Sequence, residues 1–163
     1  MKNTSYIKEK IFTKETLATQ IQAWRVSKKT IAFTNGCFDI LHEGHIYSLS
    51  QAAQEADFLV VAINSDESVS KLKGPERPIN NEETRSLIMA SLLIVDAVII
   101  FNEQTPKNLI EFLTPDILVK GGDYTIENIV GADHVIKNGG KVIINKLVEG
   151  FSTSQLINKI KTL

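Results

Sequence analysis

Short apolar segments recur along the chain, and stretches with helical signals separate them. Each apolar segment lacks the alternation of polar and apolar residues that a half-exposed strand shows, so we predict strands that are buried on both faces. These segments occupy residues 30–34, 57–63, 96–101, 116–119 and 141–147. Buried strands that alternate with helices predict an α/β fold, built on a doubly wound, parallel, five-stranded sheet.

The stretches between the strands carry the start signals of helices. Thr13 is a suitable N-cap for a helix at about residues 13–28, where apolar residues recur at helical spacing. Capping-box patterns begin at Asn80 and at Ser152. A chain of 163 residues is most simply one domain, so we expect residues 1–163 to form this helix and a core at about 30–161.

Charge and cysteine content exclude several classes of protein. The chain has 18 Lys and Arg residues against 19 Asp and Glu residues, so it has no long-range attraction to nucleic acid or to an anionic membrane. The single cysteine, Cys37, excludes an internal disulfide and fits a reducing compartment. The first 16 residues have no apolar signal-peptide region, and no apolar stretch is long enough to span a bilayer. We therefore expect a cytoplasmic protein without nucleic-acid or membrane partners.

Three unusual segments follow predicted strands. They are residues 34–45, 120–124 and 150–155, which are far apart in the sequence. The carboxyl ends of parallel strands meet at one edge of a sheet, and ligands of such folds bind there. The sequence therefore predicts that these three segments form one site.

The first segment contains His42-Glu-Gly-His45 at the start of a predicted helix. Residues three apart on a helix project on the same side, and the free N–H groups of a helix start favour an anion. Gly36 and Gly44 allow a ligand to approach the backbone. The pattern predicts a phosphate site. Two alternatives remain open: a zinc site with Cys37, which lacks an evident fourth ligand, and a purely structural role for the histidines.

The segment Asn35-Gly-Cys-Phe-Asp39 followed by His42-Glu-Gly-His45 resembles the opening of the cytidylyltransferase-like nucleotidyltransferases, which carry an HxGH signature. A narrower resemblance, to the heptose 1-phosphate adenylyltransferase domain of ADP-heptose synthesis, spans roughly residues 11–161. It is carried by four further segments, at 64–66, 71–78, 118–124 and 150–154. The resemblance implies a Rossmann-like HxGH nucleotidyltransferase fold and the transfer of an adenylyl group from ATP to D-glycero-D-manno-heptose 1-phosphate. The products would be pyrophosphate and ADP-heptose for bacterial surface polysaccharide.

The resemblance also implies roles for individual residues. The catalytic group comprises His42, His45, Lys73 and Arg85. The nucleotide-binding group comprises Thr34, Asn35, Gly36, Cys37, Phe38, Gly44, Lys120, Gly121, Asp123, Ser152, Thr153 and Ser154. The sugar-phosphate group comprises Asp39, Asn64, Lys71 and Arg77. No metal-binding side chain is implied, and Mg²⁺ is expected to arrive with ATP.

Several of these roles have plain structural alternatives. Lys73 is expected in a loop before Gly74, where it is either the mobile lysine of the family or a solvated surface residue, and Lys71 competes for the same role. Arg85 is either a phosphate contact or the partner of Glu82 within a helix. Cys37 is expected to be a packed thiol and not a nucleophile.

One position departs from the wider family. The last motif of the family ends in an arginine, where this chain has Ile157, and Lys159 is a candidate to replace that charge. The first alternative is a cytidylyltransferase that acts on glycerol 3-phosphate or another sugar phosphate, and this departure argues against the glycerol-phosphate type. A nucleotide-binding module without catalysis is the second. The resemblance further implies a homo-oligomer and a separate heptose kinase in the pathway.

Overall fold

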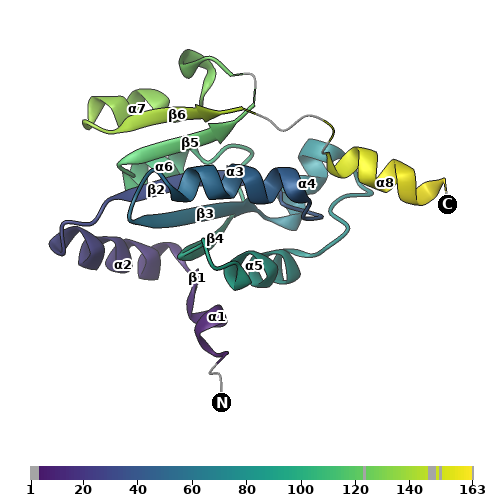
Figure 1. Ribbon diagram of the computed structural model, residues 1–163, viewed down its shortest axis with the longest axis horizontal. Helices are drawn as coiled ribbons and strands as arrows, with labels where there is room; N and C mark the ends of the chain where they lie inside the picture. The colour runs from purple at the N-terminus through teal and green to yellow at the C-terminus, as the bar shows by residue number, and fades with distance from the viewer. Residues whose placement is uncertain (1–3, 123, 147–149, 151, 163) are drawn as a thin grey trace.

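A six-stranded, fully parallel sheet forms the centre of the protein in the computed structural model, which describes residues 4–122, 124–146, 150 and 152–162 (Figure 1). The strands are β1 (Ile11–Phe12), β2 (Ile31–Gly36), β3 (Phe58–Asn64), β4 (Ala97–Phe101), β5 (Ile117–Gly121) and β6 (Lys141–Asn145). Their order in the sheet is β1-β4-β3-β2-β5-β6. From β2 the chain first adds β3 and β4 on one side and then returns to add β5 and β6 on the other side. This switch in strand order at β2 confirms the doubly wound arrangement.

The prediction of five strands was wrong by one. The additional strand is β1, which pairs with β4 through Ile11 opposite Val98 and Phe12 opposite Ile99. A two-residue strand is too short to show a hydrophobic period, and only its pairing with an edge of the sheet identifies it. The other five strands lie where the apolar segments predicted them.

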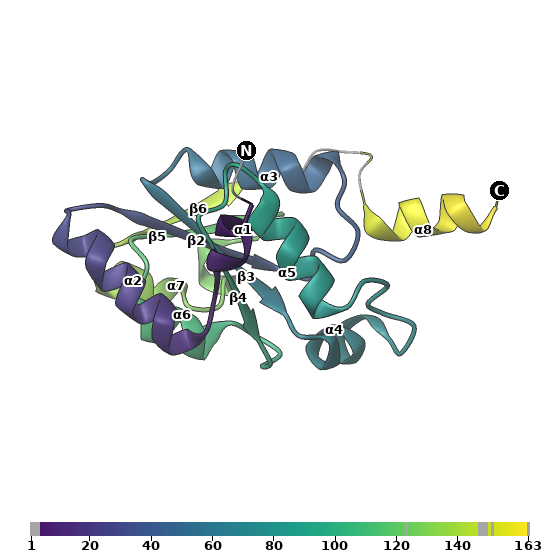
Figure 2. The ribbon, with the colours of Figure 1, turned by 90° about the horizontal axis from the view of Figure 1, so that it is seen from below.

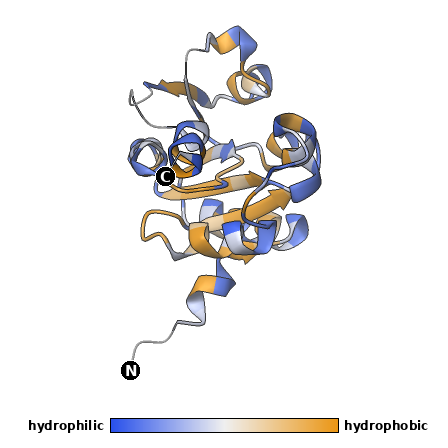
Figure 3. Cartoon of the chain, turned by 90° about the vertical axis from the view of Figure 1, so that its right-hand side faces the viewer, coloured by the Kyte–Doolittle hydropathy of each residue, from blue (hydrophilic) through white to orange (hydrophobic). Residues whose placement is uncertain are grey.

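Helices cover both faces of the sheet (Figure 2). They are α1 (Tyr6–Glu9), α2 (Lys14–Val26), α3 (Glu43–Ala53), α4 (Asp66–Lys73), α5 (Glu82–Ser91), α6 (Lys107–Leu113), α7 (Ala132–Lys137) and α8 (Thr153–Lys161), with a 3₁₀ turn η1 (Ile126–Asn128). One buried cluster joins α2, α6 and α7 to the sheet, and a second cluster joins α3 and α5 to the opposite face. The strands between these layers are strongly hydrophobic (Figure 3), as expected for a sheet covered on both sides.

Side-chain caps fix the starts of several helices. Thr13 accepts a hydrogen bond from the Thr16 amide and so caps α2 as predicted. The predicted cap at Asn80 was wrong by one residue, because Asn81 accepts the hydrogen bond from the Thr84 amide. The Asn80 side chain instead donates to the backbone carbonyl of Asp39. Asn80, which the local pattern predicted as the cap, therefore forms a tertiary hydrogen bond instead, and the next residue caps the helix.

The carboxyl ends of the strands and the starts of α3 and α8 lie at one edge of the sheet, and α8 extends away from the body of the protein (Figure 1). Among the described residues, no helix is both long enough and apolar enough to cross a membrane.

Candidate active site

Two adjoining cavities lie at the carboxyl edge of the sheet. The first, which we call the histidine cavity, has a volume of about 380 Å³. It is lined by Thr34, Asn35, Gly36, Cys37, Phe38, Asp39, His42, Gly44, His45, Ser48, Lys73, Arg77, Lys120, Gly121, Tyr124, Ser152, Thr153 and Ser154. Every described residue that the sequence assigned to nucleotide binding lies in this lining. The three segments predicted to meet at one edge of the sheet therefore do meet.

The second cavity, which we call the amide cavity, has a volume of about 400 Å³. Its own lining consists of amide and hydroxyl side chains beside apolar ones: Asn64, Leu72, Gln104, Thr105, Pro106, Leu118, Asn128, Ile129 and Val130. It shares six residues with the histidine cavity: Asn35, Gly36, Cys37, Lys73, Lys120 and Tyr124. The two cavities are therefore neighbouring compartments with a common wall.

The two histidines lie together at the start of α3. His42 is the N-cap and has an extended backbone, and His45 lies one turn into the helix. Their rings are stacked, with centroids 3.8 Å apart and planes 21° apart, and the Phe38 ring contacts His45 edge-on at 5.3 Å. The spacing of three residues thus places both imidazoles on one side of the helix, as predicted.

Burial determines the charge of the histidine pair. It lowers the pKa of His42, and burial together with the adjacent His42 ring lowers the pKa of His45 to about 4. His45 is therefore neutral at physiological pH. A neutral imidazole presents one N–H donor, so His45 can offer a hydrogen bond but no positive charge to a ligand in the cavity. No group of three or more His, Cys, Asp or Glu side chains suited to a metal occurs among the described residues.

The loop after β2 carries Cys37 between the two cavities. Its thiol lies 3.8 Å from Oδ1 of Asn64 and acts as a weak donor to it. Burial raises the pKa of the Cys37 thiol despite three nearby cations, so the sulfur is protonated at neutral pH. The thiolate is the nucleophilic form of cysteine, so this environment favours the predicted packing role.

Asp39 and Arg77 form a buried ion pair in the wall of the histidine cavity, with Nε of Arg77 2.6 Å from the carboxylate. The backbone amides of Ile79 and Asn80 also donate to this carboxylate. Burial by itself would raise the pKa of Asp39, but the hydrogen bonds from Asn80, Ile79 and Arg77 outweigh it and lower the pKa. The pair ties the segment before α5 to the loop after β2. Sugar-phosphate contacts by these two residues remain a prediction.

The structure does not bring Arg85 or Lys71 to either cavity. The Arg85 side chain is fully buried and donates to the carbonyls of Cys37 and Asn80 and to the carboxylate of Asp66. The pairing of Arg85 with Glu82 was not found, since the Glu82 carboxylate accepts from the Asp66 amide. Arg85 therefore joins three segments of the chain beneath the site.

Lys71 instead pairs with Glu67 on the exposed side of α4, at 2.5 Å. Lys73 was predicted in a loop, but it is the last residue of α4, and Gly74 follows it with a φ of 100°. Residues three or four positions apart lie on the same face of a helix. Lys71 and Lys73 are only two positions apart, so they point to different sides. Of the two lysines, only Lys73 lines the cavities, and both cavities contain it.

The start of α8 closes the histidine cavity with its hydroxyl residues. Ser152 accepts a hydrogen bond from the Gln155 amide and so caps the helix, and Thr153 donates to the carbonyl of Ile40. Ile157 and Lys159, farther along α8, do not line either cavity. Asp123 lies outside the described residues.

Most of the amide cavity was not predicted from the sequence. Gln104 and Thr105 follow β4, so the rule that sites form at strand ends would have identified them. Tyr124 ends the motif after β5 and lines both cavities. Asn128 lies in the 3₁₀ turn η1, for which no signal in the sequence was evident.

Comparison with known proteins gives a consistent result. The model of the family described as cytidylyltransferase-like matches residues 33–159. The bifunctional protein HldE of Hyphomonas neptunium is 54% identical over 143 residues, which are 88% of this chain and 29% of that protein. HldE of a Marinomonas species is 51% identical over 149 residues, covering 91% of this chain and 31% of its own length. The chain thus spans about three-tenths of the length of these relatives.

Two solved structures share the fold. A lipopolysaccharide core biosynthesis protein from Thermoplasma volcanium is 28% identical, with a TM-score of 0.58, over 74% of this chain and 97% of that one. A pantoate-β-alanine ligase from Francisella tularensis has a TM-score of 0.54 at 16% identity, over 90% of this chain and 76% of that one. The second similarity concerns the fold alone.

Proposed function

The chain belongs to the cytidylyltransferase-like family, and we propose that it is an adenylyltransferase that joins D-glycero-D-manno-heptose 1-phosphate to ATP. The products are ADP-heptose and pyrophosphate. One observation carries the proposal: the cavity lined by His42 and His45 adjoins a second cavity rich in amides and hydroxyls. The identity with the HldE proteins and the likeness to a lipopolysaccharide core biosynthesis protein support a heptose substrate and a role in surface polysaccharide.

The reaction joins two anions, so its main requirement is positioning and charge stabilisation. An oxygen of the sugar phosphate attacks the α-phosphorus of ATP, and the bond to the β-phosphate breaks. The electron pair of that bond leaves with pyrophosphate. The attacking oxygen is already ionised at neutral pH, so no side chain has to remove a proton.

The histidine cavity supplies donors for the triphosphate. His42 and His45 donate as neutral imidazoles, and residues at the starts of α3 and α8 line the same cavity, where free N–H groups of a helix start favour an anion. Ser152 and Thr153 add hydroxyls at the start of α8. These groups are fixed before the reaction and are therefore suited to stabilise charge that develops on the leaving pyrophosphate.

The amide cavity is suited to the sugar. Gln104 and Asn128 offer both donors and acceptors to hydroxyl groups, and Tyr124 offers an aromatic face beside them. A volume of about 400 Å³ is in the range of small-molecule sites. Asn64 also lines this cavity, although its amide already bonds to Ser68 and Cys37, and its sugar-phosphate contact remains a prediction.

We further propose that Mg²⁺ enters with ATP and is held mainly by phosphate oxygens. This ion prefers oxygen ligands and is commonly bound through substrate phosphates. Its charge would offset repulsion between the two substrates. The sugar 1-phosphate itself requires a kinase that acts on the sugar, and we expect the transferase to act in the cytoplasm as a homo-oligomer.

A screen of pyrophosphate release tests this function. The purified chain is mixed with Mg²⁺, one nucleoside triphosphate and one phosphorylated acceptor, with heptose 1-phosphate and glycerol 3-phosphate as the principal acceptors. We expect release with ATP and heptose 1-phosphate, and little with either substrate alone. Release only with CTP would indicate a cytidylyltransferase. Nucleotide binding without release for any pair would indicate a binding module.

A further inference from the structure

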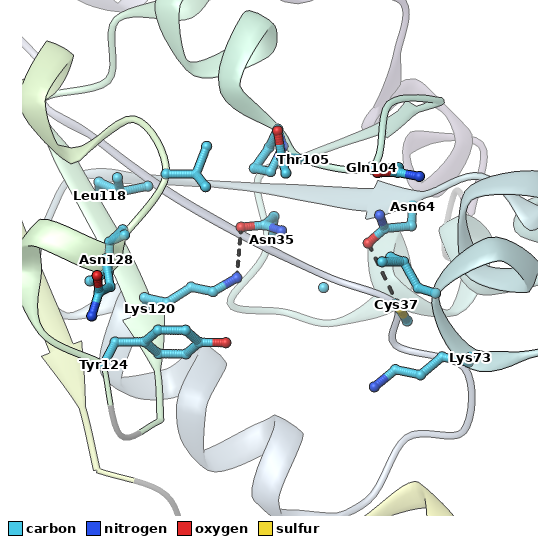
Figure 4. A pocket seen from close by; sticks show the side chains of 15 residues that line it. Asn35, Cys37, Asn64, Lys73, Gln104, Thr105, Leu118, Lys120, Tyr124 and Asn128 are labelled. Atoms are coloured by element: carbon cyan, nitrogen blue, oxygen red, sulfur yellow. Dashed lines mark hydrogen bonds between the residues drawn. The ribbon is translucent and has the colours of Figure 1, made fainter.

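Two lysines face the junction of the histidine and amide cavities. Lys73 ends α4 and Lys120 lies on β5, and both line both cavities. Figure 4 shows their side chains pointing into the same space from opposite sides. Two like charges that face one space repel each other unless an anion lies between them.

The surroundings of Lys120 leave its charge largely uncompensated. Its Nζ donates to Oδ1 of Asn35 at 3.1 Å and lies 5.9 Å from the centre of the Tyr124 ring. None of the ion pairs found between described residues includes Lys120. An ammonium has three N–H donors, so the single acceptor Asn35 leaves donor capacity for a ligand.

Burial adds to this imbalance. It lowers the pKa of Lys120, because removal from water disfavours the charged form. An anion beside the ammonium would reverse that effect. Asn35 meanwhile orients the ammonium toward the junction, since both residues line the common wall (Figure 4).

The reaction geometry identifies which anion fits. In an in-line displacement, the attacking oxygen and the leaving group lie on opposite sides of the phosphorus. In the proposed function the leaving pyrophosphate contacts the starts of α3 and α8 in the histidine cavity. The attacking phosphate must then approach from the side of the amide cavity, which means through the junction that Lys120 occupies.

We propose that Lys120, oriented by Asn35 and opposed by Lys73, binds the phosphate group of the acceptor and aims its oxygen at the α-phosphorus. The sequence motif of Lys120 had suggested a contact with the nucleotide. The proposal assigns Lys120 to the acceptor instead. The inference rests on the proposed transferase function. Lys120 exchanges no proton in the step: the new P–O bond forms, the bond to pyrophosphate breaks, and the ammonium offsets the repulsion between the two anions.

The test compares Lys120→Met with Lys120→Arg and with a matched control, Lys141→Met. Lys141 is exposed at the amino end of β6, on the opposite edge of the sheet. Loss of a charge-assisted hydrogen bond predicts that Lys120→Met raises the KM for sugar 1-phosphate by about 10- to 100-fold. The affinity for a non-hydrolysable ATP analogue should change by less than about threefold, which is near 0.7 kcal/mol. Lys120→Arg should recover part of the loss, and Lys141→Met should behave as the wild type.

Two results would overturn the assignment. An equal loss of affinity for the ATP analogue and the sugar phosphate would make Lys120 a nucleotide ligand. Unchanged kinetics in Lys120→Met would show that Lys120 contacts neither substrate.

A binding measurement separates this inference from the proposed function. Inorganic phosphate is titrated into wild type and Lys120→Met, each saturated with the ATP analogue. Should the wild type turn over no sugar 1-phosphate, the transferase function fails, but weaker phosphate binding by about tenfold or more in the variant would still support the site. Equal phosphate binding by both proteins would refute it.

Discussion

Arg85→Met is expected to destabilise the protein strongly, although Arg85 lies outside both cavities. The side chain is fully buried, and its three hydrogen bonds are short: 2.7 Å to the Cys37 carbonyl, 3.0 Å to the Asn80 carbonyl and 2.7 Å to the Asp66 carboxylate. Methionine can replace the aliphatic part of the side chain but none of these donors. The carbonyls of Cys37 and Asn80 would lose their donor, and the Asp66 carboxylate would lose its cation.

The structure sets the size of the effect. A buried acceptor left without a donor costs about 1–3 kcal/mol, and because these two hydrogen bonds are only partly buried, the two carbonyls together give roughly 2–4 kcal/mol. Asp66 adds less, because its side chain is 39% exposed and water can replace the guanidinium. We therefore expect a loss of about 2–4 kcal/mol in the free energy of unfolding, most of it from the two backbone carbonyls that lose the Arg85 donors. For a domain of this size that corresponds to a fall in Tm of roughly 10 °C.

The assay is urea unfolding followed by circular dichroism, with Arg25→Met as the matched control. Arg25 also donates to two backbone carbonyls, those of Leu113 and Thr114, but it lies at the surface. Water can replace it there, so the control should lose less than about 1 kcal/mol. If Arg85→Met were as stable as the control and yet lost its turnover, Arg85 would serve the substrate, and its hydrogen bonds would not be what stabilises the fold.

Three further outcomes follow from the geometry. His45→Ala should keep its far-ultraviolet circular dichroism but lose about 100- to 1,000-fold in pyrophosphate release, as expected for removal of one preorganised donor; activity within a few-fold of the wild type would contradict the phosphate role. Because the pKa of His45 is lowered from 6.5 to about 4, the unfolded chain binds its proton first as the pH falls, so the free energy of unfolding should decline from about pH 6.5 towards pH 4. His45→Gln should reduce that decline, and an identical pH profile in urea unfolding would refute the assignment. Gly131→Ala should lower the free energy of unfolding by about 1–3 kcal/mol more than Gly139→Ala does, as measured by thermal unfolding. Both glycines have a positive φ, but only a Cβ at position 131 would meet the Ile110 side chain, at 2.9 Å. Equal losses would show that Ile110 moves aside freely.

The position of the site followed from the sequence because local chemistry and topology agree there. Buried strands without polar alternation imply a parallel sheet, and parallel strands bring their carboxyl ends to one edge. The segments at 34–45, 120–124 and 150–155 were therefore expected to meet, and their described residues do line one cavity. The spacing of three at a helix start likewise placed His42 and His45 on one side of α3, where the structure shows their rings stacked.

Burial and long-range partners were beyond the reach of the sequence. The spacing of Arg85 and Glu82 fits a pair on one helix, but a guanidinium binds the acceptors that tertiary packing places around it. The cap at Asn81 depends in the same way on a contact between Asn80 and Asp39, which are 41 positions apart. Hydrophobic period and local spacing contain no information about such contacts.

The charge of the site also depended on the fold. The sequence provided two histidines and several lysines near one edge of the sheet, but a pKa depends on how much water surrounds each group. Burial lowers the pKa of both His42 and His45, whose rings stack on each other, and the turn of α4 brings Lys73 to face Lys120. The sequence by itself determined that the segments at 34–45, 120–124 and 150–155 meet at the edge of the sheet, because strand direction decides that. Only the tertiary structure decided which side chains carry charge into the cavities, because desolvation and distance act in three dimensions.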